Sequence, residues 1–213
     1  KMLNLTKEKV KQDFDRLPEN YKTKDVDRLI SHYVKEQADV SDLRDYVLEE
    51  PKTFHRIYYY VSLKQIKDVY KRMEFIHQNL YFEDWWHTDQ LIKFVSDMDF
   101  DTAYKYAKEY VTGDDPFIRR WGYVMFISKL GRGHAQQLLP LLHDDEEYYV
   151  QMAQSWLIAE LTISEPEIVL NWMKTNGLSY NINGKAIQKI SDSFRITDEW
   201  KKKFKDLRAE LKN

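Results

Sequence analysis

The sequence predicts an all-α protein, and three observations indicate this fold class. Glycine and proline number only six and five in 213 residues, and they lie between long periodic segments. Within those segments apolar residues recur three and four positions apart, which places them on one face of a helix. No stretch alternates polar and apolar residues between hairpin turns, so no segment resembles a strand.

The predicted helices follow one another along the chain. They cover residues 43–50, 53–80, 87–98, 101–113, 116–131 and 148–164, and a long last helix covers 196–212. In the helix over 87–98 the apolar stripe consists of Leu91, Phe94, Val95 and Met98. The last helix has a polar, basic outer face, so we expect it to cap the array.

Helix ends carry the residues expected there. Gly113 and Gly131 each follow a helical run, where glycine readily adopts the conformation that ends a helix. Pro116 and Pro166 lie near predicted helix starts, where a missing amide hydrogen costs little. Connections as short as GRGH and SEP are typical of antiparallel helix pairs.

Two segments resemble each other at a spacing of 32 residues. DDPFIRRWGYVMF begins at Asp114 and EEYYVQMAQSWLI at Glu146, and each has an acidic pair, an aromatic residue, a β-branched residue and an apolar helix. This period is typical of helical repeats. It favours a superhelical stack of antiparallel, HEAT-like helix pairs with a concave face over a closed bundle.

Composition narrows the classes of protein. The chain is 43% hydrophobic, which supports a buried core, but no apolar window is long enough to span a membrane. The charged N-terminal stretch KMLNLTKEKVKQDF resembles no secretory signal, and cysteine is absent, so we expect a cytoplasmic protein. The net charge of −2 provides no global attraction for nucleic acid, so a polyanion needs a local basic patch.

Common enzyme signatures are missing. The sequence contains no GxGxxG, GxxxxGK[ST], GxSxG or HExxH motif, which argues against phosphate-loop, dinucleotide, α/β-hydrolase and zincin chemistry. Six histidines are scattered without metal-ligand spacing. We therefore expect neither a metal site nor a cofactor, and a monomer that does not bind membranes.

Basic residues offer one candidate anion site. Arg119 and Arg120 follow Pro116, and one of them must point away from the apolar stripe of their helix. That arginine is either simply solvated or a bidentate ligand for a phosphate. Further basic residues recur at intervals compatible with one edge of the stack, namely Lys129, Arg132, Lys174, Lys185 and Lys189.

Tryptophans carry the strongest signal. Trp86, Trp121 and Trp156 lie in successive units, and core packing is the ordinary role of each. Trp85 and Trp86 differ, because neighbours on a helix point about 100° apart and one of the pair is expected to face outward. Asp89 shares their helix face, and an indole beside a carboxylate suits a cationic, sugar-linked ligand.

These residues resemble a known family. WWHTDQL is similar to the tryptophan-tryptophan-aspartate-threonine-valine-aspartate stretch of the AlkD-like DNA alkylation repair family, the HEAT-like-repeat alkylpurine DNA glycosylases. DPFIRRWGYVMF resembles the segment with that family's phosphate-binding arginine. EEYYVQMAQSWLIAELTISEPEIVLNWMKTN resembles its acid-aromatic-aromatic repeat with a central tryptophan. The resemblance covers residues 84–190.

The resemblance implies one HEAT-like-repeat domain over residues 1–213, with divergent helices over 1–80, family-like repeats over 84–190 and a capping helix in 191–213. It implies hydrolysis of the N-glycosidic bond of cationic N3- or N7-alkylated purines in duplex DNA. Asp89 would be the catalytic carboxylate. Trp85, Trp86 and Trp156 would line the lesion cleft. The DNA contacts would come from Arg119, Arg120, Lys129, Lys174 and Lys185.

Departures from the family leave alternatives open. Aligned without a gap, Gln90 occupies the family's catalytic position, whereas one deletion places Asp89 there. Residues 1–50 lack the family's N-terminal DNA-binding stretch, and SYNINGKA, from Ser179, lacks its lysine-arginine pair. The alternatives are a catalytically impaired paralogue that binds DNA weakly and a helical-repeat scaffold for a protein partner.

Overall fold

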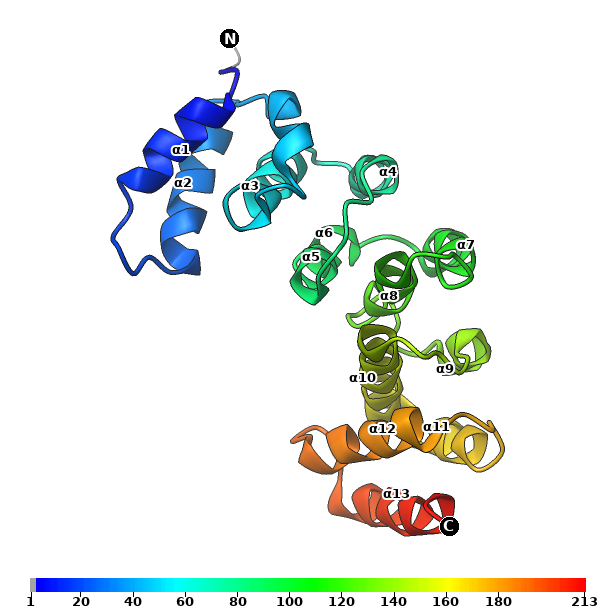
Figure 1. Ribbon diagram of the computed structural model, residues 1–213. Helices are drawn as coiled ribbons and strands as arrows, with labels where there is room; N and C mark the ends of the chain where they lie inside the picture. Colours follow the sequence, from blue (N-terminus) through cyan, green and yellow to red (C-terminus); the bar gives the residue numbers. More distant parts are fainter. Residues whose placement is uncertain (1–2) are drawn as a thin grey trace. The chain divides into compact units, whose positions relative to one another are not determined.

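The computed structural model describes residues 3–213, and it is helical throughout these residues apart from turns, loops and one isolated β-bridge (Figure 1). The predicted all-α fold class is confirmed. The chain divides into two compact units, the first ending at Glu83 and the second running from Asp84 to Asn213. The boundary falls beside the predicted start of the family-like repeats, and the prediction of a single domain over the whole chain stays a prediction.

The first unit consists of four α-helices and a 3-10 helix in its described residues. They are α1 (Lys7–Asp15), α2 (Thr23–Lys35), η1 (Ser41–Tyr46), α3 (Pro51–Lys64) and α4 (Val69–Gln78). Helix α3 lies at the centre and packs against α1, α2 and η1. The prediction of a helix over 43–50 is wrong in type, because this segment forms η1 and a turn before Pro51.

Tyrosine side chains fill much of the core of the first unit. Tyr33, Tyr58 and Tyr59 are all almost fully buried. Two of their hydroxyls donate to polar side chains of the same unit: Tyr33 donates to Asp13 Oδ2 at 2.6 Å, and Tyr58 donates to the buried Asn79 Oδ1 at 2.7 Å. Burial raises the pKa of the Tyr58 phenol above its usual value. A buried tyrosine is stable in such a core when its hydroxyl finds a hydrogen-bond partner, as these do.

The second unit contains the regular array. Its helices are α5 (Trp85–Asp89), α6 (Ile92–Val95), α7 (Phe100–Tyr110), α8 (Pro116–Val124), α9 (Ala135–Leu138), α10 (Tyr148–Ser164), α11 (Pro166–Met173), α12 (Tyr180–Asp192) and α13 (Asp198–Leu211), with the 3-10 helix η2 (Leu139–Leu141) before α10. Helices α8, α10 and α12 pack side by side in chain order, and α7, α9 and α11 form a second row (Figure 1).

The repeat predicted from two segments extends to a third. Helices α8, α10 and α12 begin at Pro116, Tyr148 and Tyr180, each 32 residues after the one before. Helix α13 packs against α12 through buried Phe204 and Leu207, and its outer face is polar. The array therefore ends as expected of a capped stack of helix pairs.

Two predicted helices are interrupted. The segment over 53–80 forms α3 and α4 with a break between them, and the segment over 87–98 ends α5 at Asp89 before α6 begins at Ile92. At the second break Leu91 donates its N–H to the Thr88 carbonyl, a tighter turn than an α-helix makes. The predicted stripe is nevertheless buried, because its side chains still face the core: Leu91, Phe94, Val95 and Met98.

One glycine sets how closely α8 approaches α7. A Cβ atom on Gly122 would lie 2.8 Å from Val111 Cγ1 and 2.9 Å from Tyr110 Cβ. The two helices are therefore in contact at a distance that no larger residue permits. In the residues that the structure describes, no helix is both long and apolar enough to cross a membrane.

Candidate active site

Helix α5 presents the tryptophan pair. Asp84 caps its start, accepting the Trp85 N–H at 2.7 Å. Trp85 is 46% exposed, so the expectation that one indole faces outward is confirmed. Trp86 is half-buried, and its ring centroid lies 4.3 Å from that of His87. Helix α5 therefore places one indole in solvent and holds the other against buried neighbours.

Asp89 ends the same helix and forms a bidentate ion pair with Arg120 of α8. The guanidinium Nη2 lies 3.0 Å from Oδ1 and 2.9 Å from Oδ2, and Nε lies 3.3 Å from Oδ1. The Thr88 hydroxyl donates to the same Oδ1 at 3.0 Å. The Asp89 side chain is 18% exposed and that of Arg120 is 5% exposed. A planar guanidinium thus holds the carboxylate in one orientation while part of it still meets solvent.

Arg120 joins three helices. Besides Asp89 of α5, it donates through Nη1 to the Tyr149 carbonyl at the start of α10, at 2.7 Å. Its charge lies 5.9 Å from the centre of the Tyr149 ring. Taking a charge out of water is costly unless its donors are satisfied, and here the acceptors surround it. The DNA contact predicted for Arg120 stays a prediction, but its donors face protein acceptors.

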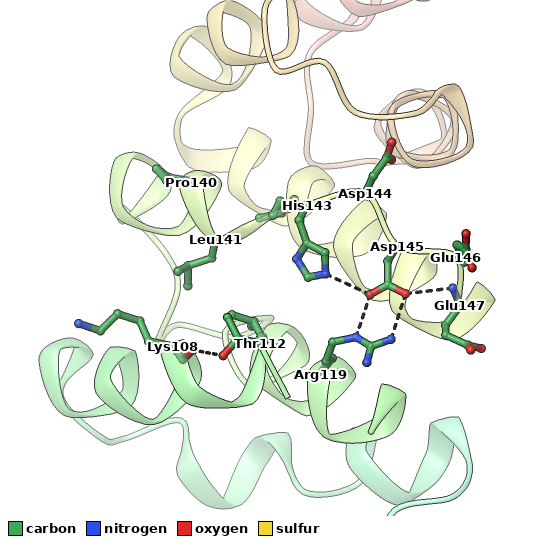
Figure 2. A pocket seen from close by; sticks show the side chains of 12 residues that line it. Lys108, Thr112, Arg119, Pro140, Leu141, His143, Asp144, Asp145, Glu146 and Glu147 are labelled. Carbon is green, nitrogen blue, oxygen red and sulfur yellow. Dashed lines mark hydrogen bonds and ion pairs between the residues drawn. The ribbon is translucent and has the colours of Figure 1, made fainter. Parts of the chain in front are cut away.

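Arg119 forms a second bidentate ion pair, with Asp145, and the two arginine–aspartate pairs are called clamps below. Its Nε and Nη2 lie 2.8 Å and 3.2 Å from the two oxygens of Asp145 (Figure 2). Its Nη1 donates to the Gly113 and Asp114 carbonyls. Of the two alternatives that the sequence left open, neither arginine is simply solvated, because each faces a carboxylate, and a contact with phosphate stays a prediction. Arg119 lines an open cleft of about 810 Å³ between the end of α7 and residues 140–147.

Asp145 is the centre of a hydrogen-bond network in this cleft. It also accepts the Glu147 N–H at 3.0 Å and contacts His143 Nε2 at 3.1 Å (Figure 2). The second histidine nitrogen, Nδ1, lies 2.9 Å from the hydroxyl of buried Tyr123. Burial by itself would raise the pKa of the Asp145 carboxyl, but the Arg119 guanidinium and the hydrogen bonds hold that pKa below its usual value.

The position of Arg119 has a polar counterpart in the following repeats. Gln151 lies 32 residues later and donates to the Asp145 carbonyl at 2.6 Å. Asn183 lies 32 residues after Gln151 and is 3.3 Å from the Leu178 carbonyl. Each side chain thus holds the loop that precedes its own helix. Sequence reasoning missed this pattern, although the 32-residue spacing contains the signal.

The remaining tryptophans separate into two environments. Trp121 is fully buried, as the core interpretation predicts. Trp156 is half-buried and lines a cleft of about 310 Å³ between α10 and α12, together with Glu160, Lys189 and Asp192. Its lesion-cleft role stays a prediction.

The predicted DNA-binding lysines lie at the surface. Lys129 is 61% exposed and paired with Asp97, Lys174 is exposed, and Lys185 is half-buried with its ammonium 5.6 Å from the centre of the Tyr148 ring. These placements are compatible with a DNA contact but do not test it.

Gln90 follows α5 as its C-cap residue, with its side-chain Nε2 3.5 Å from the His87 carbonyl. Of the two residues that the family alignment leaves open, Asp89 is therefore the one that meets Arg120. Within residues 3–213, no three His, Asp or Glu side chains gather in a way that would hold a metal ion.

Comparison with known proteins identifies a family. A family model described as DNA alkylation repair enzyme matches residues 18–190 of the chain, a range that includes Asp89, Arg120 and Asp145. No curated protein matches the chain, and no solved structure matches it.

Proposed function

Because the chain belongs to the DNA alkylation repair enzyme family, we propose that it is an alkylpurine DNA glycosylase with Asp89 as its catalytic carboxylate. The substrate is duplex DNA that carries a cationic N3- or N7-alkylated purine, and the reaction is hydrolysis of the N-glycosidic bond. The observation that carries this proposal is the bidentate Arg120–Asp89 pair at the end of the helix that exposes Trp85.

The chemistry needs a fixed negative charge more than a strong acid. When the bond between C1′ and the purine nitrogen breaks, its electron pair neutralises the cationic base, so the leaving group requires no proton. The sugar becomes an oxocarbenium ion, which a nearby carboxylate stabilises. Water then attacks C1′ and releases a proton. Asp89 is suited to the electrostatic role, because Arg120 and Thr88 fix its oxygens before the substrate arrives.

The tryptophan pair supplies a surface for the cationic base. An indole face attracts positive charge, and the attraction strengthens where water is excluded. Trp85 offers its indole to solvent four residues before Asp89. A cationic base against this helix would have an aromatic face and a carboxylate on the same element.

The test uses duplex DNA with N7-methylguanine or N3-methyladenine and measures free base. The wild-type protein is expected to release base, and Asp89→Asn should lower the rate by about 100-fold or more, as expected on losing a preorganised electrostatic group. Asp97→Asn is the matched control, since Asp97 is an exposed aspartate nearby in the chain that pairs with Lys129. If the wild-type protein releases base no faster than the Asp89→Asn variant, the proposal is ruled out.

A second candidate function is a family member that binds DNA weakly and does not cut it. The observation that favours it is that carboxylates engage both arginines, so neither has its full set of donors available for phosphates. Such a protein would make few phosphate contacts. A plot of log affinity against log salt would then have a shallow slope, about one unit per neutralised phosphate, for damaged and undamaged duplexes alike.

A further inference from the structure

The two arginine clamps converge on the start of α10. Arg119 and Arg120 are neighbours on α8, and they hold Asp145 and Asp89 respectively. Arg120 also donates to the carbonyl of Tyr149, which lies only four residues beyond Asp145. The segment that contains Asp145 therefore also contains the Tyr149 carbonyl, which holds the Nη1 edge of the Arg120 guanidinium.

We propose that Asp145 and His143 are positioning residues for Asp89, acting through the start of α10, the Tyr149 carbonyl and Arg120. This inference rests on the proposed function, in which Asp89 is the catalytic carboxylate. It assigns a role in that reaction to the network at the 810 Å³ cleft, although none of its side chains contacts Asp89 directly in the hydrogen bonds described above.

The first step runs from the carboxylate of Asp145 to helix α10. Asp145 accepts the Glu147 N–H, and Gln151 of α10 donates to the Asp145 carbonyl at 2.6 Å. The same carboxylate is bound to α8 by two hydrogen bonds from Arg119. Asp145 therefore joins the first turn of α10 to α8.

The second step runs from that turn to the candidate catalytic group. The Tyr149 carbonyl accepts Arg120 Nη1 at 2.7 Å, and the other edge of the same planar guanidinium holds both oxygens of Asp89. A guanidinium is rigid, so a shift of one edge rotates the other. Movement at the start of α10 is thereby transmitted to the Asp89 carboxylate.

His143 is part of this positioning network and is not itself a base for the substrate. Nε2 is engaged by Asp145 and Nδ1 by Tyr123, so both ring nitrogens already have protein partners. Its backbone N–H donates to Gln154 Oε1 at 3.0 Å, which fixes the loop to the middle of α10. The imidazole lines the cleft, and its Nε2 contacts the same Asp145 oxygen, Oδ2, that accepts from Arg119 Nε (Figure 2).

The experiment measures base release by the full chain as separate kcat and KM values. Asp145→Asn keeps the size of the side chain and removes its charge. It is expected to lower kcat by about 10- to 100-fold with little change in KM, because misplacement of a catalytic group by about 1 Å costs on that order. His143→Ala should lower kcat by less, and His143→Gln, which retains a donor for Asp145, should recover part of the loss.

Two control variants separate positioning from general loosening. Glu146→Gln changes an exposed neighbour of Asp145 and should leave both constants unchanged. Ser155→Ala removes a buried hydrogen bond of 2.9 Å from α10 to the Ile182 carbonyl of α12. If Ser155→Ala lowers kcat as much as Asp145→Asn at matched stability, the loss reflects loosening of α10 and the inference is overturned.

A readout without catalysis distinguishes this inference from the proposed function. The ¹⁵N–¹H resonance of Arg120 Nε reports the ion pair with Asp89, and it is expected to shift in Asp145→Asn and in His143→Ala. An unchanged resonance in both variants overturns the inference whatever the activity. A shifted resonance together with no base release by the wild-type protein would support the network while ruling out the glycosylase proposal.

Discussion

The Asp89–Arg120 pair and the Asp145–Arg119 pair are built from neighbouring arginines, yet they differ in exposure. The Asp145 side chain is 5% exposed and accepts hydrogen bonds from Arg119, His143 and the Glu147 backbone. The Asp89 side chain is 18% exposed and accepts from Arg120 and Thr88. One carboxylate is thus enclosed by donors, whereas the other keeps a face toward solvent.

In these two pairs the helical repeat separates a carboxylate that holds the fold from one that a substrate can reach. An enclosed carboxylate is costly to remove, because its partners lose a buried acceptor, but it has no face left for a substrate. A carboxylate held from one side is fixed in place and still reachable. Replacing aspartate by asparagine should therefore cost more stability at Asp145 than at Asp89, and more activity at Asp89 than at Asp145.

The largest expected effect on stability is at the enclosed carboxylate. Asp145→Asn should lower the free energy of unfolding by about 2 to 4 kcal/mol, since the enclosed carboxylate accepts hydrogen bonds from Arg119, His143 and the Glu147 N–H, and a neutral amide replaces only part of them. Asp89→Asn should cost about 1 to 2 kcal/mol, because water can solvate part of the site. Urea unfolding of the two variants and the wild-type protein measures both values, and a larger loss in Asp89→Asn would contradict this comparison.

The next effect concerns His87, which in α5 lies 32 residues before Arg119. Burial lowers the pKa of His87 from 6.5 to about 4, despite the opposing influence of Asp84. Between these values the unfolded chain binds more protons than the folded one, so stability falls as pH falls from about 6.5 toward 4. Between pH 7 and pH 5 this histidine should account for a loss of about 1 to 2 kcal/mol.

The check is urea unfolding of wild type and His87→Gln at both pH values. The variant lacks the titrating group, so its stability should decrease less on acidification. An equal decrease in the two proteins would show that His87 is not the group responsible.

The smallest expected effect is at Gln151, the counterpart of Arg119 in α10. Gln151→Ala removes the hydrogen bond to the Asp145 carbonyl and should cost about 1 kcal/mol, the usual net value of a neutral hydrogen bond. Gln188→Ala is a suitable control, since Gln188 is an exposed glutamine on α12. If Gln151→Ala lowers the free energy of unfolding as much as Asp145→Asn does, the hydrogen bond to the loop backbone stabilises this region as much as the ion pair does, which would contradict the comparison.

Much of the fold was predictable because its signals are local. Apolar spacing identified the long helix α10, proline marked the starts of α8 and α11, and the outward indole of the tryptophan pair followed from helix geometry. The breaks at α5–α6 and α3–α4 were missed, because the apolar pattern continues through them and the tight turns there lack glycine and proline.

The candidate site was predictable only in part. The sequence pointed to Asp89, Trp85 and the two arginines by their types and by family resemblance, but it assigned the arginines to solvent or phosphate. Tyr123, His143 and Asp145 were missed because their roles depend on contacts across 20 and 26 residues. No periodic pattern selects one acid among the 35 acidic residues of the chain as the partner of a given arginine.

A helical protein with a 32-residue repeat and a tryptophan pair turned partly to solvent can be predicted from local sequence, because helix formation, capping and amphipathic spacing are properties of short segments. The carboxylate that each arginine meets lies 26 residues away for Arg119 and 31 for Arg120, and it is selected by tertiary packing. That choice depends on how α5, α8 and α10 pack, since a guanidinium pairs with whichever acid the packing brings within hydrogen-bond distance.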